Sequence, residues 1–209
     1  ADLDGEDVDE VTLVLTGEDV SALADTKVSL RAGLELAGVT LSNTALKDVA
    51  AEKGDEVTLT AAARTNGVYV EVAVDGKAMS QVEGGVRVTL PVSDPTGGTV
   101  LILVGSDGTG TVIKKSAVVE GGVCAILEGS CTVRAEDRSR TFADVKSSDW
   151  FAGAVAFVSS RELFQGVSDA QFAPTVPMTR AMLVTVLWRM DGKPGAAGGS
   201  SFTDVPRGQ

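Results

Sequence analysis

The aromatic side chains of this chain are confined almost entirely to its last third, and this division constrains the fold more than any other feature. In the first 139 residues, Tyr69 is the one aromatic residue. The other eight follow: Phe142, Trp150, Phe151, Phe157, Phe164, Phe172, Trp188 and Phe202. Because aromatic rings dominate the packing of any core that contains them, the two stretches are expected to build separate cores.

Net charge divides at the same place. The 209 residues carry a formal charge of −11, and residues 140–209 contain seven basic and six acidic groups, which leaves −12 for the first 139. An acidic N-terminal part argues against binding to nucleic acid or to an anionic membrane surface. The coincident changes predict two independently folded units that meet near residues 136–141.

An acidic segment at residues 1–10 precedes the first unit. An EF-hand calcium loop needs Gly at its sixth position and Glu at its twelfth, but counting from Asp2 places Gly5 fourth and Leu13 twelfth. We therefore expect a solvated acidic linker rather than a calcium site. The first residue is not Met, and no apolar stretch is long enough for a signal peptide or a membrane span, so targeting information is expected to lie upstream or to have been removed.

Residues 11–138 are predicted to form a β-rich module. Apolar side chains alternate with polar or small ones over residues 57–63 and 68–74, which is the period of a half-buried strand. Asn66-Gly67 and Asp75-Gly76 follow these runs, and both dipeptides favour two-residue type I′ turns. Other strand-like segments lie at residues 11–15, 79–82, 86–90, 100–104, 111–115, 117–127 and 131–134.

Strands of this number and length predict a mostly antiparallel, sandwich-like domain whose valines form a buried face. One or two short helices are expected with it, over residues 19–24 and from a cap at Ser42 or Asn43 to about Lys53. Together with a helical unit beyond residue 140, the fold class is α+β multidomain.

Cys124 and Cys131 are predicted to lie on neighbouring strands of one hairpin. A four-residue loop at residues 126–129 would place them opposite each other and allow a disulfide. A two-residue turn at Glu128-Gly129 would leave their Cα atoms diagonal, about 7–8 Å apart and too far for easy closure. The sequence leaves both arrangements open.

The residue types that most enzymes depend on are missing or misplaced. The chain has no histidine, which removes Ser-His-Asp and Cys-His catalysis and histidine-containing zinc sites. The glycine-rich segment at residues 105–110 lacks the Lys and Ser/Thr of a phosphate-binding loop and is predicted to be a hairpin loop. We expect no catalytic residues, no cofactor and no metal.

Beyond Arg140 the apolar spacing becomes helical. Ser147 or Ser148 is expected to cap a helix that starts near Asp149. Its apolar face would comprise Trp150, Ala154, Phe157 and Val158 and end at Arg161. A second helix is expected from a Thr179 cap to Gly192, with Leu183, Val186, Leu187 and Met190 on one face.

A short motif recurs sixty residues apart, as Phe142-Ala143-Asp144-Val145 and Phe202-Thr203-Asp204-Val205, which is typical of a repeat. Around it the chain resembles the S-layer homology domain. The resemblance rests on Phe142-x-Asp144-Val145, Trp150 with Ala154-Val155, Leu163-Phe164-x-Gly166, Phe172-x-Pro174, Thr179-Arg180-Ala181 and Leu187-x-Arg189. One departure is Met182, where the family usually has Glu.

The resemblance implies one complete repeat at residues 139–194, followed at 195–209 by a linker and the start of a second. It further implies a secreted protein of the cell surface, attached non-covalently to secondary cell-wall polysaccharide that often carries pyruvylated sugars. Family members typically combine three repeats and bind ligands in the grooves between them. The β-rich module resembles, less specifically, modules that precede such repeats in Gram-positive surface proteins.

Four residues are the candidates for polymer binding. Arg180, at a helix N-terminus, offers a charged planar fork to the carboxylate of a pyruvate ketal, and Thr179 precedes it. Gly166 would permit a turn or a close ligand approach. Trp150 is either a core residue, which its spacing favours, or a platform for a sugar ring. Asp144 is expected to act as a cap or to bond the backbone locally rather than to meet a ligand.

Two other functions remain open at this stage. The β-rich module could be an adhesin that binds a host protein through its strand edges or loops. It could also be an accessory domain of a secreted enzyme whose catalytic part lies elsewhere. Catalytic motifs in the sequence upstream would favour the second of these, and further β-modules the first or a purely structural role.

Overall fold

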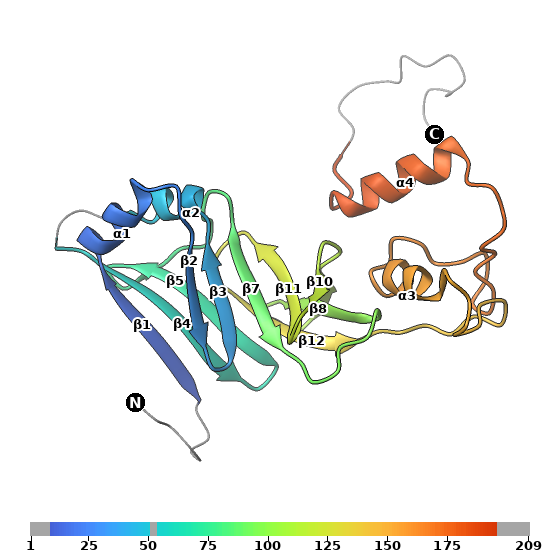
Figure 1. Ribbon diagram of the computed structural model, residues 1–209, viewed down its shortest axis with the longest axis horizontal. Coiled ribbons are helices and arrows are strands. Elements are labelled where there is room, and N and C mark those ends of the chain that lie inside the picture. The colour runs from blue at the N-terminus through green and yellow to red at the C-terminus, as the bar shows by residue number, and fades with distance from the viewer. Residues whose placement is uncertain (1–8, 51–53, 196–209) are drawn as a thin grey trace.

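The computed structural model describes residues 9–50 and 54–195. Two units follow each other along the chain, a β-module over residues 9–137 and a helical unit over residues 138–195 (Figure 1). The expected acidic linker and the calcium alternative at residues 1–10, and the start of the second repeat, fall largely outside these ranges.

Two antiparallel sheets make up the β-module. The first contains, in spatial order, β1 (Glu10–Thr16), β4 (Glu56–Arg64), β5 (Gly67–Val74), β12 (Cys131–Asp137), β8 (Thr99–Val104) and β9 (Gly110–Val112), with β6 (Lys77–Ala78) paired to β5. The second contains β10 (Ala117–Val119), β11 (Gly122–Leu127), β7 (Val86–Pro91), β3 (Ala37–Leu41) and β2 (Leu30–Leu34). The α+β class expected from the sequence is confirmed.

One apolar core joins the two sheets. Leu59 and Val72 of the first sheet belong to the same buried cluster as Val39, Val88 and Val123 of the second. Two short helices, α1 (Gly17–Ala24) and α2 (Asn43–Asp48), lie beside each other at one end of the sheets (Figure 1). As predicted, Ser42 caps α2, its hydroxyl accepting the N–H of Ala45.

Several predicted strand boundaries are wrong. Strands β2 and β3 were not predicted, because glycine interrupts their alternation at Gly33 and Gly38. The apolar run at 117–127 is divided into β10 and β11 by a turn at Glu120-Gly121. The β4–β5 hairpin forms as expected, but its turn is Thr65-Asn66, one residue earlier than predicted, since Arg64 pairs with Gly67. The turn at Asp75-Gly76 is as predicted, with positive φ at both residues.

The predicted cysteine hairpin is wrong. Cys124 lies on β11, which pairs with β7 and β10, whereas Cys131 lies on β12, which pairs with β5 and β8 in the other sheet. Between them the chain crosses from one sheet to the other. This crossing is fixed by Ser130, whose N–H donates to Met79 O (2.8 Å) and whose hydroxyl accepts the N–H of Val72 (3.0 Å). Both thiols are free.

The helical unit contains α3 (Ala152–Ser160) and α4 (Arg180–Met190), joined by a long irregular segment. The prediction that Ser147 or Ser148 caps α3 is wrong, because consecutive tight turns occupy residues 146–152 and the cap position is Phe151, without a side-chain bond. The buried side of α3 therefore differs from the predicted one: it comprises Val155, Ser159 and Ser160.

The two thiols should both be reactive in the unfolded protein and slow to react in the native one. Burial raises the pKa of Cys131 to about 11, so at neutral pH its reactive thiolate is scarce, and Cys124 is buried outright. A count with a chromogenic thiol reagent under non-reducing conditions checks this. Two fast thiols after denaturation are expected; finding none would mean a disulfide and would contradict the free thiols of the structure.

Candidate functional site

Asp144 organises the irregular segment of the helical unit. Its Oδ1 accepts the backbone N–H of Phe172 (2.9 Å) and its Oδ2 that of Ala173 (2.7 Å). These hydrogen bonds stabilise the carboxylate and hold the pKa of Asp144 below its ordinary value. Beside them the ring of buried Phe142 meets that of Phe172 edge to face, with centroids 5.3 Å apart. Asp144 bonds the backbone, as expected, but the prediction that it does so locally is wrong, because its partners lie 28 and 29 residues away.

Gly166 lies at a turn that no other residue type fits. Its φ is +82°, and a Cβ there would come within 2.6 Å of the carbonyl oxygen of Gln171. That oxygen accepts the N–H groups of Val167 (2.9 Å) and Ser168 (3.2 Å), which close a compact loop. Gly166 was predicted to permit either a turn or a close approach of ligand, and the structure accounts for the turn.

Thr179 caps α4 as predicted. Its hydroxyl accepts the N–H of Met182 (3.2 Å), which satisfies one of the free donors at the helix start. Arg180 is the first residue of α4, and its side chain is exposed. At the third helical position Met182 offers no carboxylate to complete a capping box. The cationic fork thus lies at the positive end of the helix dipole, where anions are favoured.

A groove of about 470 Å³ lies between α3, the irregular segment and α4. Its walls are mostly apolar, and Trp150 and Gly166 belong to them. Arg189 also lines it, held there by a hydrogen bond from its Nη1 to the carbonyl oxygen of Leu163 (2.9 Å). We refer to this feature as the α3–α4 groove. Its lining also includes Phe151, Val155, Phe164, Phe172, Pro174, Met182 and Val186.

Trp150 is not a core residue, so the interpretation that its spacing favoured is wrong. Trp150 is 93 % exposed. The reason is local: α3 begins only at Ala152, so Trp150 lies in the turn before the helix and outside the helical spacing assumed for it. Its ring meets that of Phe151 edge to face, with centroids 5.5 Å apart, at the groove wall.

The four candidate residues thus fall into two pairs. Trp150 and Gly166 line the α3–α4 groove, whereas Thr179 and Arg180 lie at the N-terminal end of α4 and are not part of its lining. Arg189 belongs to the groove but was not among the candidates. Its place at the end of the Leu187-x-Arg189 motif was the available signal.

The predicted apolar face of α4 is mostly uncovered. Val186 is buried, but Leu183, Leu187 and Met190 are exposed. The helix therefore presents an apolar surface that the described part of the chain does not cover. In residues 9–50 and 54–195, no helix is long and apolar enough to cross a membrane, and no cluster of three potential metal ligands occurs.

Comparison with known proteins identifies part of this unit. Residues 141–181 match the S-layer homology domain. The chain is 44 % identical over 54 residues to the middle cell wall protein of Brevibacillus brevis, covering 26 % of this chain and 5 % of that protein. It is 38 % identical over 60 residues to a cellulosome-anchoring protein of Acetivibrio thermocellus. This match covers 29 % of this chain and 13 % of that protein.

A surface layer protein of Brevibacillus choshinensis is 42 % identical over 52 residues, which cover 25 % of this chain and 5 % of that protein. The chain therefore spans only a small part of the length of each of these relatives. No solved structure gives a significant match.

Replacing Asp144 by Asn should destabilise the helical unit at neutral pH and less so in acid. An amide retains one acceptor oxygen and puts a donor against the second N–H. Because the folded pKa of Asp144 is depressed, its stabilisation is complete above the unfolded value of 3.8 and is lost as pH falls through the lower folded pKa. The stabilities of the wild-type and variant proteins towards urea should therefore become equal at a pH below the folded pKa of Asp144.

Urea unfolding followed by tryptophan fluorescence measures this effect, because Trp150 and Trp188 are the two tryptophans of the chain and both lie in the helical unit. Asp169→Asn is the control, since Asp169 is fully exposed and its ion pair with Arg140 is long, at 3.8 Å. Equal urea midpoints for Asp144→Asn and wild type at pH 7 would refute the role assigned to Asp144.

Proposed function

Because residues 141–181 form the S-layer homology domain of a secreted, cell-surface protein, we propose that this domain attaches the β-module to the secondary polysaccharide of the cell wall. The family match carries the proposal. The relative described as a cellulosome-anchoring protein supports it, since its name describes the same task of holding other components. The β-module is then the displayed part.

The chemistry at the start of α4 suits an anionic sugar. A pyruvate ketal carries a carboxylate, and Arg180 can meet it with two parallel N–H groups while the helix terminus favours negative charge. Thr179 uses its hydroxyl on the backbone, so its part in binding is to keep this terminus ordered.

The α3–α4 groove supplies a second kind of contact. Sugar rings pack their C–H faces on aromatic rings, and Trp150, which is 93 % exposed, leaves the face of its indole available for this. Tryptophan is highly buried on average in folded proteins, so this degree of exposure is unusual. We assign Trp150 the role of sugar platform, and Gly166 that of shaping the groove wall beside it.

A single repeat is expected to bind weakly. The apolar side of α4 is uncovered in the described structure, and the motif beginning at Phe202 predicts a further repeat. If the ligand lies between repeats, a lone repeat exposes Arg180 to water, where an ion pair contributes only about 0–1 kcal/mol. A second repeat would exclude water from the contact and strengthen it.

We further propose that the chain has no catalytic role of its own. The absence of histidine from the sequence supports this, as do relatives whose names describe anchoring or structural proteins. Hydrolase activity that copurifies with the chain and is lost on a point mutation within it would contradict this proposal.

In a protein extended through its following repeats, Arg180→Ala should weaken binding to purified wall polymer by about tenfold, the cost of a charge-assisted contact. Arg180→Lys should weaken it less, because the charge remains and the planar fork is lost. Trp150→Ala should weaken it through loss of the platform. Co-sedimentation with cell-wall sacculi, with and without chemical removal of pyruvate, measures all three.

The matched control is Lys146→Ala, which removes an exposed cation elsewhere in the same unit. After removal of pyruvate from the polymer, the wild type and Arg180→Ala should bind equally well. Trp150→Ala should still bind more weakly than the wild type. Tight binding by residues 1–209 alone, or no effect of Arg180→Ala in the extended protein, would contradict the proposed inter-repeat contact.

A further inference from the structure

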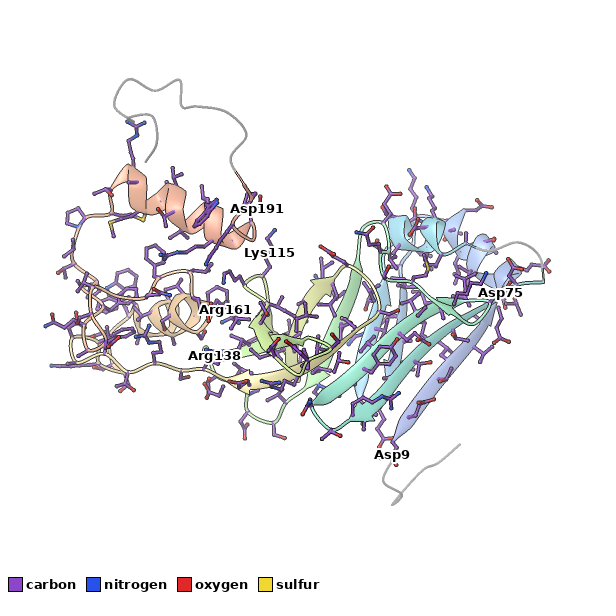
Figure 2. All side chains as sticks on the ribbon, turned by 180° about the vertical axis from the view of Figure 1, so that it is seen from behind. Asp9, Asp75, Lys115, Arg138, Arg161 and Asp191 are labelled. Carbon is purple, nitrogen blue, oxygen red and sulfur yellow. The ribbon has the colours of Figure 1, made fainter. Side chains whose placement is uncertain are left out.

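Arg161, at the C-terminal end of α3, is completely buried although it carries a charge (Figure 2). The hydrogen-bond partners described for its guanidinium are carbonyl and hydroxyl oxygens, with no carboxylate among them. Burial lowers its pKa to about 10, so it remains protonated at neutral pH. A buried charge is costly unless every donor is satisfied, which makes its partners informative.

Three of those partners belong to the β-module. Nε donates to the carbonyl oxygen of Ser116 (2.7 Å), Nη1 to that of Gly97 (3.1 Å) and Nη2 to that of Thr99 (3.0 Å). Two further bonds stay within α3, from Nη1 to Phe157 O (3.3 Å) and to Ser160 Oγ (3.1 Å). The guanidinium also lies 3.8 Å from the ring centre of Phe157.

The next residue, Glu162, adds ion pairs across the same boundary. Its carboxylate lies 3.3 Å from Nζ of Lys114, which belongs to the β-module, and 3.7 Å from Nη2 of Arg138, which directly follows β12. Glu162 directly follows the C-cap of α3 and has φ +57°, a left-handed conformation that glycine prefers. Lys115 and Asp191, 3.9 Å apart, form another contact between the two units (Figure 2).

We propose that Arg161 and Glu162 form a latch that fixes the orientation of the β-module relative to the helical unit. The guanidinium is planar and donates to three carbonyl groups that are held by strands and turns. All three hydrogen bonds can therefore form in only one orientation of the β-module relative to the helical unit. Buried ionic groups contribute to such specificity more than to net stability. The β-module has its own core, so the latch determines its orientation and not its folding.

The consequence is a rigid connection rather than a hinge at residues 138–140. The module is then presented at one angle to the surface that carries the helical unit. This inference does not depend on the polymer proposed above, and its test uses none.

The connector itself provides the test, because Arg138 and Arg140 are trypsin sites within it. In the wild-type chain the latch should keep the connector from adapting to the protease. Arg161→Met and Arg161→Lys should each raise the rate of cleavage after Arg138 and Arg140 by about tenfold, since cleavage follows the population of the open form. Arg161→Lys keeps the positive charge but loses the planar guanidinium, so it tests whether the latch depends on the geometry of the donors rather than on charge. Lys146→Met is the matched control, an exposed cation removed from the same unit.

Because Arg161 also bonds α3, its replacement could unfold the helical unit rather than release it. Glu162→Gly avoids this ambiguity. Glycine relieves the positive φ and so favours the local fold, while the ion pair with Lys114 of the β-module and the ion pair with Arg138 of the connector are lost. Cleavage after Arg140, which is not a partner of Glu162, should then rise about threefold, as expected for the loss of two ion pairs, with tryptophan fluorescence unchanged.

Cleavage rates after Arg138 and Arg140 are measured by mass spectrometry on a time course. Faster connector cleavage in Glu162→Gly and both Arg161 variants, with Lys146→Met unchanged, supports the latch. Wild-type cleavage as fast as that of the variants, or a Glu162→Gly protein cut at the wild-type rate, overturns it.

Discussion

Side-chain hydrogen bonds to the backbone hold the helical unit in shape. With only two helices, most of its peptide groups have no partner in regular secondary structure, yet buried peptide groups need one. Asp144 accepts two N–H groups of the irregular segment, and Arg189 and Arg140 donate to the carbonyl oxygens of Leu163 and Gln165. Arg161 does the same for carbonyl groups of the neighbouring β-module. Removing any of these side chains exposes an unsatisfied backbone group rather than an apolar void.

The candidate site depends on this arrangement. The bonds of Asp144 and Arg189 position the irregular segment and α4, and the α3–α4 groove is the space left between them. Trp150 is exposed for a related reason: the turns before α3 delay the helix start and carry the indole outward. Apolar side chains thus remain uncovered on both the groove and α4. In the proposed function, these surfaces are where the polymer and the following repeat would bind.

Features that depend on near neighbours in the sequence were predictable. The helix caps at Ser42 and Thr179 and the Asp75-Gly76 turn follow from local rules and are confirmed. The family motifs and the α+β class were also found. Some local predictions failed as well, such as the Ser147 or Ser148 cap of α3 and the exact turn between β4 and β5, but the larger failures were non-local. Nothing between Cys124 and Cys131 signals a change of sheet, and the burial of Arg161 depends on carbonyl groups 45 to 64 residues away. A periodic pattern identifies an apolar face but not the partner that covers it.

The position of β12 has a mechanical consequence. This strand leads directly into the connector (Figure 1) and is internal to its sheet, paired with β5 on one side and β8 on the other. Tension from an anchored helical unit would pull along the strand axis and load both ladders in shear, so that many hydrogen bonds must break together. An edge strand pulled in the same direction would load only one ladder and would therefore resist less. The chain thus connects its anchor to the β-module through a strand that resists extraction by force.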